Sequence, residues 1–296
     1  MSTLDNIIKK ITYKRLATIL LIVTIIPLLM PFGLPIPISP ETEDFKTEID
    51  KLTPGSTVAV GWQIAGLGGL PGSRPGYRVI TKYLALKGMK IVYISFSDVS
   101  PIAAEDTVNG LDVEATYGWK YGEDYVISSY IPGEETAIAS FAADVQGTMG
   151  TDYYGTPISD LPLMENIKTM NDFDLMISYY GTFTFADMFA RQWGSEYPDV
   201  PWIAFSQFGT LTAYYPTVCK GALDLARGGA EFESLTNMPG VYISRMDARN
   251  LYGFTLLILM LAGNVAYYQT TGFRKKVGAG FEKAFFGEEK EGERIE

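Results

Sequence analysis

The stretch STVAVGWQIAGLGGLPGSRPGYR, residues 56–78, decides the fold class of this chain. Its first part is a short apolar run that predicts a β-strand over residues 57–62. Its last part has the spacing of an amphipathic helix, predicted over residues 74–87. A buried strand that leads through glycines into a helix is the first half of a βαβ unit, which indicates a parallel sheet.

The glycines between this strand and helix complete neither of two known phosphate-binding motifs. A P-loop needs Lys and Ser/Thr where Leu67 and Gly68 stand, and Pro71 occupies the place of the third glycine in a dinucleotide-binding pattern. We therefore predict a structural turn, in which Ser73 caps the helix and Pro75 fits its first turn. The alternative is a backbone-lined anion or ligand site at the end of the strand.

The alternation of strand and helix continues through the central region. It predicts an α/β domain over residues 41–248, with a doubly wound, three-layer, Rossmann-like and mostly parallel sheet. An irregular insertion is expected over residues 98–124, a short helix within 162–171, and a last edge strand near residue 241. The predicted strands are 57–62, 90–97, 125–131, 173–180 and 202–207, and the predicted helices are 74–87, 134–147, 185–196 and 215–235.

Two uncharged apolar blocks flank this domain, at residues 16–37 and 251–273. Each is long enough, as a helix, to cross a hydrocarbon core about 30 Å thick. We predict that both are transmembrane helices. A cleaved signal peptide is the alternative for the first block and a buried core helix for the second, although the first block has no small-x-small cleavage site.

Basic residues around the two blocks predict how the chain is oriented. Four Lys/Arg precede the first block and three follow the second at residues 274–276, while Arg245 and Arg249 argue weakly for the opposite orientation. The sequence thus predicts a two-pass protein of the cell membrane, with a cytoplasmic N-terminus (residues 1–15) and a charged cytoplasmic tail (residues 274–296). The central domain would then be extracytoplasmic.

Composition excludes several kinds of chemistry. Residues 41–248 carry 27 Asp/Glu against 13 Lys/Arg, a net charge of −14 that disfavours nucleic acid as a partner. The chain has no histidine and one cysteine, so one chain cannot form a Ser-His-Asp triad, a Cys/His zinc site or an internal disulfide. We predict no cofactor and no metal. Cys219, in an apolar helical pattern, is expected to be a small buried side chain rather than a reactive thiol.

One short pattern occurs twice, as SYYGTFTF at residues 178–185 and SQFGTLTA at residues 206–213. Each copy lies where a strand is expected to end and a helix to begin, so helix capping by its threonines is one explanation. The other is a ligand site, because open parallel sheets bind ligands beyond the carboxyl ends of their strands. The candidate ligand-binding residues at that edge are Ser97, Asp98, Tyr180, Thr182, Gln207 and Thr210.

The segment QWGSEYPDVPWIAFSQFGT, residues 192–210, together with strands that end in polar and aromatic groups, resembles one lobe of the type 1 periplasmic binding proteins. The resemblance implies a ligand-binding α/β lobe. Proteins of that family close two lobes around a ligand, whereas residues 41–248 suffice for one, so a second lobe would have to come from another subunit.

Partners are also expected inside the membrane. Asn264 lies in the middle of the second apolar block, where its amide should seek a partner across a helix interface, and Ala262 and Ala266 beside it form a small-xxx-small face. That partner is another subunit, in a homo-oligomer or membrane complex, or else the first apolar block of the same chain. Ala222, Ala226 and Ala230 would form a similar small-residue strip on the predicted helix 215–235.

Three functions remain compatible with these observations. The leading prediction is a non-enzymatic, membrane-anchored extracytoplasmic binding or assembly subunit, with the lipid bilayer, a protein partner and a possible small molecule as its ligands. The first alternative is an extracytoplasmic hydrolase that uses carboxylates such as Asp98, Glu105 and Asp106. The second is a ligand sensor that signals through the two helices.

Overall fold

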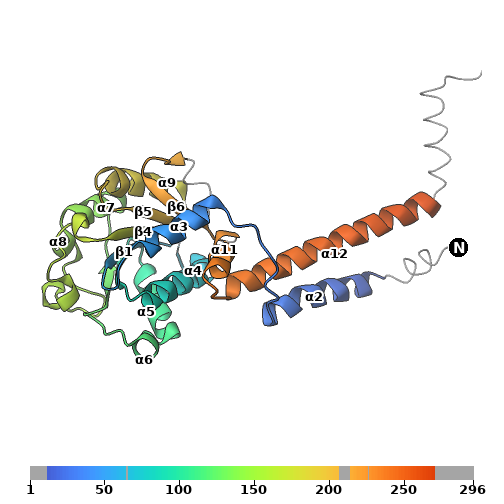
Figure 1. Cartoon of the computed structure of the whole chain (residues 1–296), viewed down its shortest axis with the longest axis horizontal. Coiled ribbons are helices and arrows are strands. Elements are labelled where there is room, and N and C mark those ends of the chain that lie inside the picture. The colour runs from blue at the N-terminus through green and yellow to red at the C-terminus, as the bar shows by residue number, and fades with distance from the viewer. Residues whose placement is uncertain (1–11, 65, 207–213, 226, 271–296) are drawn as a thin grey trace, which may run out of the picture. The chain divides into compact units, whose positions relative to one another are not determined.

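The computed structural model describes residues 12–64, 66–206, 214–225 and 227–270 (Figure 1). The chain divides into two compact units. One is Pro31–Met246, which contains the sheet, and the other combines Met1–Met30 with Asp247–Glu296.

A single sheet of six parallel strands forms the centre of the Pro31–Met246 unit. The strands lie in the order β3-β2-β1-β4-β5-β6, which is the order of the Rossmann fold. The predicted α/β, Rossmann-like fold is therefore confirmed, and the described strands are all parallel. Their bounds are β1 Thr57–Gln63, β2 Lys90–Ser95, β3 Tyr125–Tyr130, β4 Leu175–Tyr180, β5 Trp202–Ser206 and β6 Cys219–Asp224.

Helices cover both faces of this sheet because successive strand residues point to opposite sides and both sides are apolar. In β1, Val58, Val60 and Trp62 belong to one core cluster, whereas Ala59 belongs to the other. The first cluster lies under α3 (Pro40–Asp50), α4 (Gly66–Leu86), α5 (Ser100–Leu111), α6 (Val113–Tyr117) and α11 (Arg227–Leu235). The second lies under α7 (Glu134–Ala143), α8 (Val145–Met149), α9 (Phe183–Phe189) and the π-helix η4 (Ala190–Ser195) (Figure 1). Short 3₁₀ turns occur at η1 (Ile158–Asp160), η2 (Pro162–Met164) and η3 (Met170–Asp172).

The helix predicted over residues 215–235 is wrong. The chain instead forms β6 and then the shorter helix α11, so Cys219 is a buried strand residue, and Ala222 and Ala230 belong to different elements. Residue 226 lies outside the described residues. The reason is a backbone contact that only glycine allows, because a Cβ atom on Gly221 would lie 2.4 Å from the backbone nitrogen of Phe45 in α3.

Three further elements differ from their predictions. The supposed insertion 98–124 contains the two helices α5 and α6, and the edge strand expected near residue 241 is the start of helix α12 (Val241–Thr270). Helix α4 begins at Gly66, so Ser73 lies inside it and donates a hydrogen bond to the Gly69 carbonyl (3.1 Å) instead of capping it. The glycine-rich stretch is therefore the first part of the helix and not a turn before it.

The two apolar blocks form helices of unequal length. Helix α2 covers Tyr13–Leu29, so the first block does not stay helical to residue 37, because the prolines from Pro31 onward cannot continue a helix. Its 17 residues span about 26 Å, slightly less than a hydrocarbon core. Within the described residues, only α12 is long and apolar enough to be a candidate membrane span, at Val241–Val265. This supports membrane association weakly, and the two-pass arrangement stays a prediction.

Candidate functional site

The carboxyl edge of the sheet, where its parallel strands end, has a switch point between β1 and β4. Helix α4 leaves β1 toward one face of the sheet, and α9 leaves β4 toward the opposite face. The two strands are neighbours in register, with Gln63 beside Tyr180 as their last pair. Beyond that pair, the amide of Gly181 donates a hydrogen bond to Gln63 Oε1 (3.4 Å). In folds of this kind, ligands bind in the crevice that such divergence creates.

Helix α4 begins directly at this switch point. Gly66 adopts a left-handed backbone conformation (φ +65°), which a glycine reaches without strain. A Cβ atom on Gly69 would lie 2.9 Å from the Ile64 side chain, so the first turn of α4 packs closely on the end of β1. The amino terminus of this helix, with the positive end of its dipole, therefore lies at the carboxyl edge, where the Gly66 amide donates a hydrogen bond to the Ile64 carbonyl (2.8 Å).

Of the predicted ligand-binding residues, Ser97 has a structural role. Its hydroxyl accepts a hydrogen bond from the Ile64 amide (3.2 Å) and shares another with Ser100 (2.6 Å), which donates to the Trp62 carbonyl (3.0 Å). Ser97 is 9% exposed. These bonds hold the ends of β1 and β2 together at the carboxyl edge.

The structure describes three of the other predicted residues, one of them buried and two exposed. Tyr180 is fully buried and stacks on Phe189 with 5.9 Å between ring centroids; burial raises the pKa of its hydroxyl well above the usual tyrosine value. Asp98 and Thr182 are exposed, and Thr182 makes no capping hydrogen bond, so capping does not account for it. Gln207 and Thr210 lie outside the described residues.

Two of the three carboxylates proposed for hydrolysis, Glu105 and Asp106, contact neighbouring side chains. Glu105 accepts hydrogen bonds from Tyr153 (3.2 Å) and Tyr154 (3.5 Å). Asp106 forms ion pairs with Arg74 (3.2 Å) and Arg78 (3.4 Å). These contacts anchor side chains of α5 to their neighbours.

Two buried glutamates on α11 form a feature that the sequence analysis missed. Glu231 Oε2 accepts hydrogen bonds from the Ser39 amide (2.9 Å) and the Thr42 hydroxyl (2.8 Å), and Arg227 donates to Oε1. Burial would raise the pKa of Glu231, but these bonds outweigh it and lower the pKa. Glu231 therefore fastens the start of α3 to α11 as a carboxylate.

Glu233 caps the start of α12 in a similar way. Its Oε2 accepts hydrogen bonds from the amides of Gly240 (3.1 Å) and Ile243 (2.8 Å), and its Oε1 from that of Tyr242 (3.2 Å). The first turn of α12 thus receives acceptors from a neighbouring helix, which a residue at the helix start usually supplies. Burial raises the pKa of Glu233 despite these bonds. The segment GGAEFESL, with two acids among small and apolar residues, was the only sequence signal for this pair.

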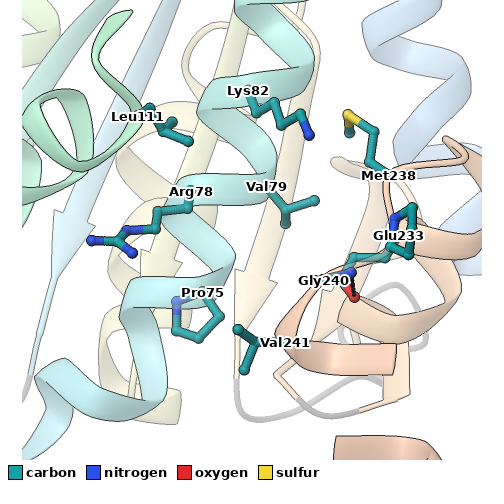
Figure 2. Close-up of a pocket in the computed structure, with 10 residues that line it drawn as sticks. Pro75, Arg78, Val79, Lys82, Leu111, Glu233, Met238, Gly240 and Val241 are labelled. Carbon is teal, nitrogen blue, oxygen red and sulfur yellow. Dashed lines mark hydrogen bonds between the residues drawn. The ribbon is translucent and has the colours of Figure 1, made fainter. Parts of the chain in front are cut away.

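A cavity of about 140 Å³ lies beside this second cap (Figure 2). Side chains of α4 form one wall, and the turn from α11 into α12 forms the other. Figure 2 shows Val79 and Lys82 directed from α4 toward that turn, while Arg78 points to the other side of the helix.

No family model, curated protein or solved structure matches this chain.

Proposed function

We propose that this chain is a membrane-anchored, extracytoplasmic α/β subunit of a membrane complex that binds and does not catalyse. Its ligand, a small molecule or a protein segment, would occupy the carboxyl edge of the sheet between β1 and β4. The Rossmann strand order supports the ligand site, and the apolar helix α12 supports the membrane anchor.

The link between Gln63 and Gly181 is the observation that carries the ligand site. It fixes two diverging strand ends at the switch point, beside the amino end of α4. Asp98 follows β2 and Thr182 follows β4, the two strands that flank β1, and both exposed side chains would supply polar groups for recognition. A preorganised crevice with a few polar groups is typical of small-molecule sites in α/β sheets.

The acidic domain and the membrane helix support the rest of the proposal. A net charge of −14 over residues 41–248 disfavours nucleic acid and anionic surfaces as partners of the domain. Asn264, exposed on α12 near the small side chain of Ala262, offers an amide to a second helix. In the sequence, Ala266 would extend that face, but the side chain of Ala266 lies outside the part of the chain that the structure describes.

Ligand screening of the full chain by thermal unfolding tests the site at the carboxyl edge. A true ligand raises stability by RT ln(1 + [L]/Kd). Thr182→Val and Asp98→Asn should each reduce the affinity for that ligand by about tenfold. Neither should change the stability of the free protein, because both side chains are exposed. Glu123→Gln, at an exposed position near the amino end of β3, is the matched control. A hit that neither edge substitution weakens would contradict this location.

Sensing is a second candidate, and the Glu233 cap favours it. The three hydrogen bonds to Glu233 make the first turn of α12 part of the core of the α/β unit. Helix α12 then continues without a break to Thr270. A ligand that altered the cap would therefore act directly on the helix that is the candidate membrane span.

A further inference from the structure

The cavity between α4 and the α11–α12 turn has predominantly apolar walls. Pro75 and Val79 of α4 face Met238 and Val241 (Figure 2), and Leu111 at the end of α5 also lines the cavity. The volume of about 140 Å³ is close to that of engineered protein cavities that hold one benzene molecule. The size therefore selects a compact body of roughly six to ten heavy atoms.

The charged groups of this cavity are unequally engaged. Arg78 forms an ion pair with Asp106, and Glu233 already accepts three backbone hydrogen bonds at the positive end of α12. Lys82 is half-buried, and no carboxylate pairs with it anywhere in the described part of the chain. The ammonium group that Figure 2 shows directed toward the turn thus has no counter-ion among the residues that the structure describes.

We propose that this cavity binds a small organic anion. An apolar body of benzene size would lie against Val79, Met238 and Val241, and its carboxylate would pair with the ammonium of Lys82. The ligand class follows from the combination of walls and charge, since an apolar cavity alone would favour a neutral molecule and a lone lysine alone would favour any anion.

The position of the cavity gives binding a consequence for α12. Three residues of the cavity wall belong to the start of α12 or to its cap. Val241 is the first residue of the helix, and Gly240 and Glu233 form part of the cap. A ligand seated there stabilises the first turn of α12 in its capped position. The inference goes beyond the proposed function, because the carboxyl-edge site lies at the start of α4 and this cavity lies along its later turns.

Calorimetric titration of the full chain in nanodiscs tests the ligand class with three probes of one shape. Benzoate, benzyl alcohol and benzylamine differ in charge and share an apolar ring. Benzoate should bind at least about tenfold more tightly than benzyl alcohol, because a charge-assisted contact to Lys82 is added, and benzylamine should bind most weakly. Equal affinities for the acid and the alcohol, or no binding by any probe, would overturn the proposal.

Substitutions locate the binding. Lys82→Met should reduce benzoate affinity about tenfold, to that of benzyl alcohol, while Lys82→Arg should retain most of it. Lys168→Met, which removes an exposed positive charge between η2 and η3, is the control for net charge and should change nothing. Val79→Phe should fill the cavity and abolish binding of both acid and alcohol. If that variant fails to fold, Leu111→Phe blocks the same space from α5, and unchanged benzoate binding in the Lys82→Met variant would still refute the site.

Discussion

Glu231 and Glu233, two residues apart on α11, cap the first turns of two different helices. Glu231 accepts from Ser39 and Thr42 at the start of α3, whereas Glu233 accepts from Gly240, Tyr242 and Ile243 at the start of α12. Positions i and i+2 of a helix point to nearly opposite sides, so α11 can serve both neighbours at once. One short helix thereby secures both segments that lead toward the apolar helices.

Removing either carboxylate should destabilise the α/β unit. Glu231→Ala and Glu233→Ala each leave several buried donors without an acceptor, which costs about 1–3 kcal/mol per group left unsatisfied. We expect the free energy of unfolding to fall by at least that amount, measured by denaturant titration of tryptophan fluorescence in the full chain. Glu123→Ala, at an exposed glutamate, should stay within about 0.5 kcal/mol of the wild type. Loss of similar size in all three variants would contradict the capping roles.

The two glutamates should affect the pH dependence of stability in opposite directions. The pKa of Glu231 is lowered in the folded state, so its stabilising contribution is present above the ordinary glutamate pKa and is lost as pH falls through the lowered value. The pKa of Glu233 is raised, so its contribution is present below the ordinary pKa and is lost as pH rises through the raised value.

Glutamine variants separate these two contributions. The stability advantage of the wild type over Glu231→Gln should grow as pH rises from about 3 to 5, and its advantage over Glu233→Gln should shrink as pH rises above about 4.3. Unfolding free energies measured across this range check both trends. Parallel profiles for the two variants would refute the assigned shifts.

Two glycines of α4, four residues apart, should respond oppositely to the same substitution. A Cβ atom on Gly76 would lie 1.8 Å from the Phe205 ring, whereas Gly72 is exposed with nothing within 4 Å. Gly76→Ala should therefore destabilise by about 1–3 kcal/mol through overpacking, and Gly72→Ala should stabilise by about 0.5–1 kcal/mol through helix propensity. Thermal unfolding of both variants measures the difference, and equal shifts would mean that α4 does not lie against β5 as described.

Cys219 should be unreactive in the folded protein. It is 3% exposed, and burial raises the pKa of its thiol to about 12, so little thiolate forms near neutral pH. A maleimide should label it only after denaturation. Rapid labelling of the native chain would contradict this burial.

This inert thiol provides a clean background for testing topology. Asp199→Cys places a thiol in the exposed turn before β5. A membrane-impermeant maleimide should label this variant on intact cells if the α/β unit is extracytoplasmic. Labelling only after lysis would place the unit in the cytoplasm and refute the predicted orientation.

Asn264 should contribute to an assembly in the membrane. Asn264→Leu removes the amide that would hydrogen-bond across a helix interface, so the mass of the native particle in mild detergent should decrease relative to the wild type. Val265→Leu, an apolar exchange at the next position, is the control and should leave the mass unchanged. A wild-type protein that is monomeric and free of partners would refute the interface.

The sheet could be predicted because its strands carry local signals. Buried parallel strands such as β1 and β4 are short continuous apolar runs between polar or glycine-rich segments, and these patterns depend on little else. β6 escaped prediction because CKGALD contains small residues of weak strand preference. Its conformation depends on the contact of Gly221 with Phe45, which lies far away in the sequence.

The location of the candidate site stays a prediction, and the structure shows only how its individual residues are placed. The strand-end rule placed it at the carboxyl edge, and Asp98 and Thr182 are indeed exposed there. Which side of the strand end a residue faces depends on packing, and Tyr180 is covered by Phe189 of α9. The capping roles of Glu231 and Glu233 could not be predicted for a related reason, since their partners lie in segments that only the tertiary structure brings together.

The bond between Ser39 and Glu231 joins residues 192 positions apart, and this separation constrains the order in which the chain can fold. During synthesis, α3 emerges long before β6 and α11. Phe45 and Ile49 of α3 therefore lack their final neighbours until almost the whole domain has been made. Closing so long a loop is slow, since its entropy is lost before the contacts form. Ribosome-bound chains that stop before residue 219 should therefore expose α3 to proteases or chaperones, whereas chains that extend past α11 should protect it.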